Sequence, residues 1–144
     1  MLTEKDYCDY DTCVALNELG LSFEDASQRF ERNILTNIYE EVPRPLLYEA
    51  QKWLMTQGIY IAPRIYLYHD INLDDETSWE CNIYIAYAAI YTVGKSLSYE
   101  DALLLGIKEG INKLRELHER RRQKLEMENT EFDYGHNINH KEIN

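Results

Sequence analysis

The segment 98–117, SYEDALLLGIKEGINKLREL, constrains the fold most strongly, because it predicts one amphipathic helix that must pack closely on another element. Ser98 followed three residues later by Asp101 is typical of a helix N-terminus. The apolar residues then recur at steps of three and four and so form one stripe: Leu103, Ile107, Gly110, Leu114 and Leu117. Two glycines inside a helix cost about 1 kcal/mol each relative to alanine. We therefore expect the face with Ala102, Gly106 and Gly110 to lie against a sheet or another helix.

Two short helices are predicted near the N-terminus. Asp11 is placed to cap the first helix, and Gly20 ends it. Ser22 with Asp25 repeats the signal for a helix start. The second helix would carry its apolar side chains on one side, at Phe23, Ala26, Phe30 and Ile34. Residues 36–43 are expected to connect it to the next element.

A third helix is predicted to begin near Pro45 and to end at Gly58. Its buried stripe would consist of Leu46, Leu47, Ala50, Trp53 and Leu54. After this helix the apolar residues alternate, which predicts a half-buried strand over 59–68. Pro63 cannot donate to a ladder, so this strand is expected at a sheet edge or at a bend.

A second strand is predicted over 79–86, and residues 88–93 either continue it or form a third strand. The long helix comes next, and beyond Glu116 it keeps charge but loses its apolar stripe. Residues 126–144 show no periodicity and are expected to be a flexible acidic tail. Together, these elements predict an α+β two-layer sandwich, with N-terminal helices, a two- or three-stranded antiparallel sheet and a long C-terminal helix. Residues 1–125 would form its single domain.

Composition narrows the class of protein. The 144 residues carry a net charge of −11, which repels phosphate and disfavours nucleic acid as a partner. No apolar run is long enough for a transmembrane helix, and the N-terminus lacks the pattern of a signal peptide. The three cysteines fit reduced thiols better than a disulfide framework. These features predict a cytoplasmic protein without a membrane partner.

One pattern of packing residues in this sequence resembles the pattern found in small accessory proteins of phages and mobile elements of gut bacteria. The set is Pro45, Tyr48, Ala50, Trp53, Leu54, the run 58–61, Trp79 and the run 98–102. The resemblance covers about residues 44–117 and implies an α-β-β-α core with no assigned active site. The last helix is also similar to the end of HicB-type antitoxins, although the Pro-Gly-Cys turn expected before that helix is missing.

Motifs for catalysis, metals and cofactors are weak or incomplete. Residues 70–75 imitate the start of a calcium loop, but Asp75 stands where glycine is needed and Cys81 where glutamate is needed. His136 and His140 are four residues apart without a third ligand at matching spacing. No phosphate loop, dinucleotide motif or nucleophile elbow is present. We therefore predict no metal, no cofactor and no catalytic residue; a small hydrolase would need His69, a serine and a carboxylate brought together.

The twelve tyrosines are the most informative feature for function. Tyr60, Tyr66 and Tyr68 share one face of the first strand, and Tyr84 is expected on the outer face of the second. Three uses remain open: burial in the core, a protein interface, and stacking on nucleic-acid bases. Together with the helix face of Ala102, Gly106 and Gly110, the four tyrosines form the candidate protein interface.

The sequence thus predicts a small non-catalytic interaction protein that contacts a protein partner, with a second copy of the chain as one possibility. A basic cluster at the end of the last helix supports an alternative, a nucleic-acid-associated regulator. This cluster consists of Arg120, Arg121, Arg122 and Lys124, and it would contact phosphate or an acidic partner. Capping of the helix dipole explains the same residues without any ligand.

Overall fold

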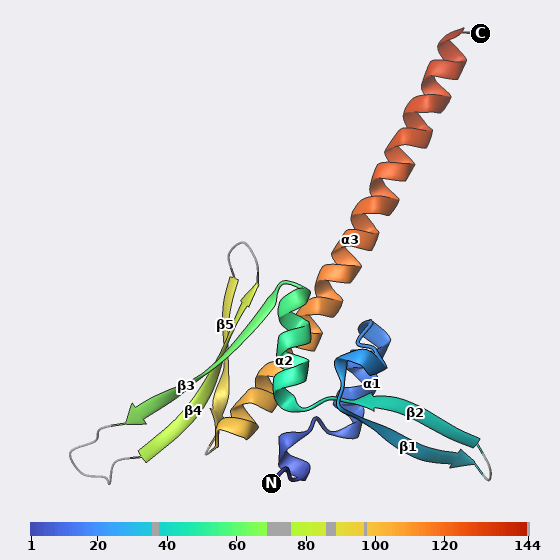
Figure 1. The fold of residues 1–144 in the computed structure, drawn as a ribbon. Helices are drawn as coiled ribbons and strands as arrows, with labels where there is room; N and C mark the ends of the chain where they lie inside the picture. The colour runs from blue at the N-terminus through green and yellow to red at the C-terminus, as the bar shows by residue number, and fades with distance from the viewer. Residues whose placement is uncertain (36–37, 69–75, 86–88, 97, 144) are drawn as a thin grey trace. The chain divides into compact units, whose positions relative to one another are not determined.

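The computed structural model describes residues 1–35, 38–68, 76–85, 89–96 and 98–143. The chain divides into two compact units, Met1–Lys113 and Leu114–Asn144. Among the described residues, the first unit contains five strands and the helices α1 and α2 (Figure 1). Helix α3 (Tyr99–Ile143) begins in the first unit, and its later part forms the second unit. The fold class is α+β with a long C-terminal helix, as the sequence predicts.

Helix α1 (Tyr10–Leu19) starts two residues earlier than expected, because Asp9 and not Asp11 is its N-cap. The Asp9 carboxylate accepts a hydrogen bond from the Thr12 amide at 2.9 Å and lies 2.9 Å from Lys108 Nζ. Gly20 ends the helix with a φ of 119°, a left-handed conformation that glycine adopts without strain.

Removing the cap at Asp9 should weaken the fold in a pH-dependent way. Partial burial raises the pKa of Asp9, but the Thr12 hydrogen bonds and Lys108 outweigh it and hold the pKa below its ordinary value of 3.8. The stabilisation is therefore present above that value and is lost as the pH falls through the folded-state pKa. We expect Asp9→Ala to cost about 1 kcal/mol at neutral pH, the usual effect of losing an N-cap.

The measurement is urea unfolding of the wild type, Asp9→Ala and Asp9→Asn at neutral pH and at about pH 3. Asparagine keeps a capping oxygen but lacks the charge, so Asp9→Asn should be the milder variant. The difference between wild type and Asp9→Asn should shrink on acidification; an unchanged difference would contradict a role for the Asp9 charge.

The predicted second helix is wrong. Ser22 donates hydrogen bonds from its amide and its hydroxyl to Asp25 Oδ2, at 2.8 and 3.0 Å, but these bonds close only the single 3-10 turn η2 (Phe23–Asp25). Strand β1 (Gln28–Leu35) comes next and pairs antiparallel with β2 (Ile38–Arg44), where a connection was expected. A capping signal specifies one turn, and the non-local pairing with β2 decides the structure of the next residues.

Arg44 at the end of β2 joins this hairpin to the N-terminal segment. Its guanidinium lies 4.3 Å from the Tyr7 ring centre and 4.6 Å from that of Phe30, and it pairs with Glu4 at 2.6 Å. Another short 3-10 turn, η1 (Glu4–Asp6), precedes Tyr7, which forms an isolated bridge with Leu46. Stacking on aromatic rings lets a guanidinium lie in a largely buried position.

Helix α2 (Leu47–Thr56) confirms the predicted third helix. Its first turn is stabilised by Glu49, whose Oε1 accepts hydrogen bonds from the Leu46 and Ser27 amides at 2.9 and 3.1 Å. The buried side of the helix consists of Leu47, Ala50, Trp53 and Leu54, all of them predicted.

The second sheet has the strand order β3-β4-β5, with β3 (Ile59–Tyr68), β4 (Glu76–Ile85) and β5 (Ala89–Ser96) all antiparallel. Of the two possibilities left open for residues 88–93, the structure shows a separate third strand, β5. Ile59, Ile61, Cys81 and Ile83 on one face of this sheet are buried. Helix α3 approaches this face at Gly106 and Gly110, where an added Cβ would meet Cys81, Ile61 and Ile59. The close approach expected for the two glycines is therefore confirmed.

Helix α3 continues to Ile143, so the residues expected to form a flexible acidic tail from 126 onward are helical as far as Ile143. Residues of high helix propensity and pairs at helical spacing favour this continuation without an apolar stripe. One such pair joins Arg122 and Glu126, with 3.6 Å between Nη1 and Oε1. In the part of the chain that the structure describes, no helix combines the length and apolarity needed to cross a membrane.

Candidate protein-interaction surface

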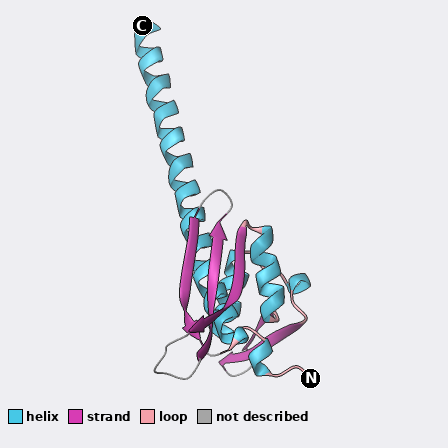
Figure 2. Cartoon of the chain, turned by 90° about the vertical axis from the view of Figure 1, so that its left-hand side faces the viewer, coloured by secondary structure: helices cyan, strands magenta, loops and turns pink. Residues whose placement is uncertain are grey.

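The face of the β3-β4-β5 sheet opposite Gly106 is the candidate surface. We call it the outer face and define it by the described side chains that point away from α3: Tyr60, Ala62, Arg64, Glu80, Asn82, Tyr84 and Thr92. Figure 2 looks onto this sheet, with the strands in front of the helices of the first unit. Within residues 1–113, no described helix covers it.

Two tyrosines dominate the outer face. Tyr60 on β3 and Tyr84 on β4 are direct cross-strand partners, and 45% and 40% of their surfaces are exposed. Strand alternation explains this placement, since their neighbours Ile59, Ile61 and Ile83 point to the opposite face and are buried. Burial in the core, one of the three uses left open by the sequence, is therefore wrong for these two residues.

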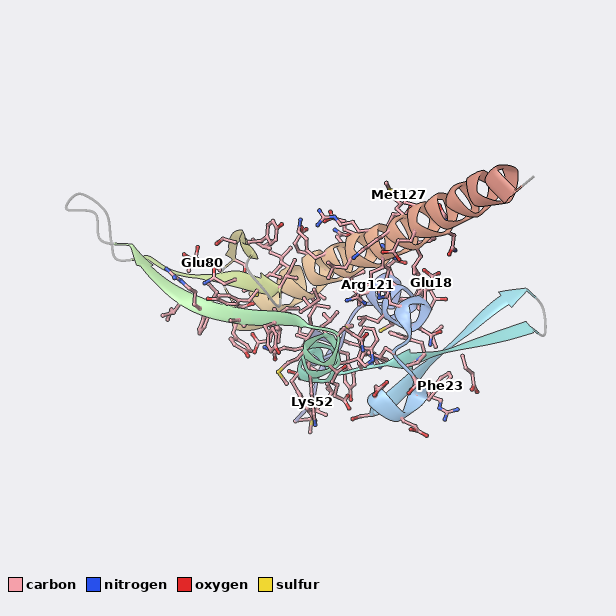
Figure 3. The ribbon with its side chains drawn as sticks, turned by 90° about the horizontal axis from the view of Figure 1, so that it is seen from above. Glu18, Phe23, Lys52, Glu80, Arg121 and Met127 are labelled. Atoms are coloured by element: carbon pink, nitrogen blue, oxygen red, sulfur yellow. The ribbon has the colours of Figure 1, made fainter. Side chains whose placement is uncertain are left out.

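Polar residues of the outer face are paired with one another. Arg64 Nε lies 2.9 Å from Glu80 Oε1, and the two residues are also cross-strand partners (Figure 3 labels Glu80). Thr92 donates its hydroxyl hydrogen to Asn82 Oδ1 at 3.1 Å. These pairs fix the orientation of four side chains and leave the described part of the face without a net charge.

The β3 edge beside this face is protected against pairing with another strand. Gln51 of α2 donates a hydrogen bond to the Ile61 carbonyl at 2.6 Å, and Pro63 has no amide hydrogen to offer. Blocked edges disfavour association through added strands. At β3, the outer face therefore offers a contact that this edge does not.

The remaining predicted interface residues fall into two groups. Tyr66 and Tyr68 belong to β3, but their side chains lie outside the described residues. Ala102, Gly106 and Gly110 are buried, and the two glycines lie against the chain's own sheet and α2, so the prediction that this helix face contacts a partner is wrong. The physical reason is that the small residues already serve the internal approach of α3 to β3 and β4.

The basic cluster of the last helix is partly neutralised within the helix itself. Arg122 contacts Glu119 at 2.6 Å and Glu126 at 3.6 Å, and its hydrogen bond holds the pKa of Glu119 below its usual value. Arg120, Arg121 and Lys124 are exposed. Exposure on a helix surface does not by itself indicate a phosphate ligand, so this alternative stays a prediction.

Residues proposed for metal or catalytic roles are not brought together where they are described. No group of three potential metal ligands exists among the described residues. His69 and the calcium-like run 70–75 lie outside the described residues, and so do the side chains of His136 and His140. Ser96 donates its hydroxyl hydrogen to the Ser98 carbonyl at 3.1 Å.

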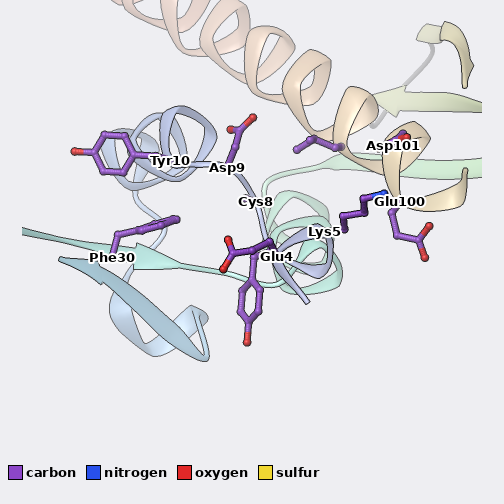
Figure 4. A pocket seen from close by; sticks show the side chains of 10 residues that line it. Glu4, Lys5, Cys8, Asp9, Tyr10, Phe30, Glu100 and Asp101 are labelled. Carbon is purple, nitrogen blue, oxygen red and sulfur yellow. The ribbon is translucent and has the colours of Figure 1, made fainter. Parts of the chain in front are cut away.

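A pocket of about 370 Å³ near the N-terminus was not predicted (Figure 4). Four carboxylates line it, from Glu4, Asp9, Glu100 and Asp101. Two of them are already engaged, since Glu4 pairs with Arg44 and Asp9 with Thr12 and Lys108. The pocket is therefore best described as a space between ion pairs that support the fold.

The cysteines are all buried and free. Cys8 packs beside Cys13, whose thiol lies 3.5 Å from the Cys8 carbonyl oxygen, and the hydrogen bond with Cys13 together with burial raises the pKa of Cys8. Burial raises the pKa of Cys81 to about 11. Thiolates are scarce at Cys8 and Cys81, and all three cysteines pack in the core.

Comparison with protein-family models, with curated proteins and with solved structures finds no match to this chain. The resemblance to phage and mobile-element accessory proteins and to antitoxins therefore stays a prediction.

Proposed function

We propose that this chain is a small non-catalytic interaction protein that binds a protein partner through the outer face of its β3-β4-β5 sheet. The observation that supports this most directly is the exposed pair Tyr60 and Tyr84, held side by side on a face that no described helix of residues 1–113 covers. Tyrosine provides a large contact area for few rotatable bonds and is enriched at interface centres.

The charge distribution supports a protein partner over nucleic acid. The outer face is neutral in its described part, and the whole chain carries −11. Base stacking on tyrosines is accompanied by cations that track the phosphate backbone, and Arg64 is already paired with Glu80. The packing residues that resemble phage and mobile-element proteins support an accessory role in such an element.

Photo-crosslinking in cells tests the proposal. A photoreactive phenylalanine analogue at position 84 keeps an aromatic ring on the outer face, and the same analogue at position 48 is the control. Tyr48 is also an exposed tyrosine, 61% accessible, but lies on α2. We expect position 84 to give a discrete protein product, identified by mass spectrometry, that position 48 does not give. Equal yields at both positions would contradict a specific outer face.

A further inference from the structure

The outer face has the charge balance that a second copy of the same chain requires. Two chains of −11 each repel one another, and this repulsion is weakest where the local charge is close to zero. One cation and one anion stand on the described part of the face, Arg64 and Glu80, and they are paired. A basic partner would find no excess of negative charge there.

The order of side chains along the face is also suited to two-fold pairing. Three cross-strand pairs succeed one another along β3 and β4: Tyr60 with Tyr84, Ala62 with Asn82, and Arg64 with Glu80. The middle pair is low, because Ala62 has only a methyl group and Asn82 is 9% exposed. The aromatic pair lies on one side of the middle pair and the charged pair on the other. A two-fold axis that runs through the middle pair, parallel to the sheet and across its strands, therefore places the aromatic pair of one copy opposite the charged pair of the other.

We propose that the outer face binds a second copy of this chain around a two-fold axis near Ala62 and Asn82. In this arrangement Arg64 of each copy lies over the tyrosine pair of the other. Isologous contacts of this kind repeat every interaction twice. A guanidinium on an aromatic ring is favourable, and this chain uses the same contact internally, where Arg44 stacks on Tyr7 and Phe30. The inference rests on the proposed function and specifies its partner.

Sedimentation or light scattering of the full chain over a range of concentrations is the first test. We expect a dimer whose dissociation constant does not rise with salt, because screening reduces the repulsion between the two acidic chains. Tyr60→Thr/Tyr84→Thr and Arg64→Ala should each weaken it at least tenfold, and Tyr48→Thr should not. A wild-type chain that is monomeric throughout would overturn the inference.

Mixing two variants tests the axis itself. Each homodimer of the tyrosine variant or of Arg64→Ala has lost both tyrosine–arginine contacts. The heterodimer keeps one of these contacts, because the intact Arg64 of the tyrosine variant meets the intact tyrosines of the Arg64→Ala chain. We therefore expect the mixed species in excess of its statistical share, by native mass spectrometry. A statistical or smaller share would overturn the proposed axis.

The replaced side chains are exposed, and threonine suits a strand, so matched thermal melts should show that both variants fold.

The experiments distinguish a failure of this inference from a failure of the proposed function. A monomeric chain whose position 84 captures a different protein would overturn the second copy and keep the interaction surface. A monomeric chain without a specific product at position 84 would overturn both.

Discussion

Replacing Trp53 by alanine is expected to lower the free energy of unfolding by about 3–5 kcal/mol, the usual cost of removing a buried tryptophan. Trp53 lies on the buried side of α2 and is only 8% exposed. Its Cζ2 would be 3.7 Å from a Cβ at Gly20, so the ring packs where α1 ends. A cavity there would separate the end of α1 from α2, and both elements would lose contact area.

Lys52→Ala provides the matched control, because Lys52 precedes Trp53 on the same helix and points to solvent (Figure 3). Exposed substitutions of this kind change stability by no more than about 0.5 kcal/mol. Urea unfolding followed by far-ultraviolet circular dichroism measures both, since it does not depend on the removed fluorophore. A loss below about 1 kcal/mol for Trp53→Ala would contradict close packing at this site.

Gly106→Ala is expected to destabilise the protein by about 1–3 kcal/mol, even though alanine is the better helix former. A Cβ at this position would overlap the Cys81 sulfur and come within 2.7 Å of Ile61 Cγ2. Cys81 and Ile61 are themselves buried in the sheet, so neither can move away without displacing a strand. The cost of overpacking therefore exceeds the gain of about 1 kcal/mol in helix propensity.

Gly110→Ala is the internal comparison, one turn along the same face. Its Cβ would meet the terminal Cδ1 atom of Ile61 at 3.0 Å and Cγ2 of Ile59 at 3.2 Å, and side-chain ends can adjust by a few tenths of an ångström. We expect Gly110→Ala to be clearly milder than Gly106→Ala in the same urea experiment. Equal costs would show that the approach of α3 is uniform along the helix.

A double-mutant cycle identifies the atom responsible. Cys81→Ala removes the sulfur that Gly106→Ala would overlap, so the two substitutions together should cost less than the sum of their separate effects. Strict additivity would place the clash elsewhere. The cycle also tests whether Cys81 is a packing residue, because its substitution alone should leave the fold intact at a modest cost.

Strand alternation predicts which side chains share the candidate surface. It does not predict which side chains of neighbouring strands pair with one another. The alternation of 59–68 and 79–86 places Tyr60 and Tyr84 on the same side. The pairing of Arg64 with Glu80 depends on the register between β3 and β4, which the sequence of each strand does not specify. The role of Gly106 and Gly110 was ambiguous for a similar reason: their spacing predicts a close approach without saying which element approaches.

The pairing of β1 with β2 shows that a local capping signal specifies the backbone of only one turn. Ser22 and Asp25 make the predicted hydrogen bonds, but one turn later the backbone groups of β1 pair with β2 instead of forming a helix.

By itself, the sequence determined α1 and its glycine end, α2 with its buried stripe, the alternating strands and the start of α3. Each of these depends on residues within a few positions of one another, whose spacing fixes caps and faces. Only the tertiary structure decided that residues 28–35 pair with residues 38–44, that α3 lies on Ile61 and Cys81, and that Tyr60 and Tyr84 are exposed. Those outcomes depend on contacts between residues far apart in the chain, where burial and register outweigh local preference.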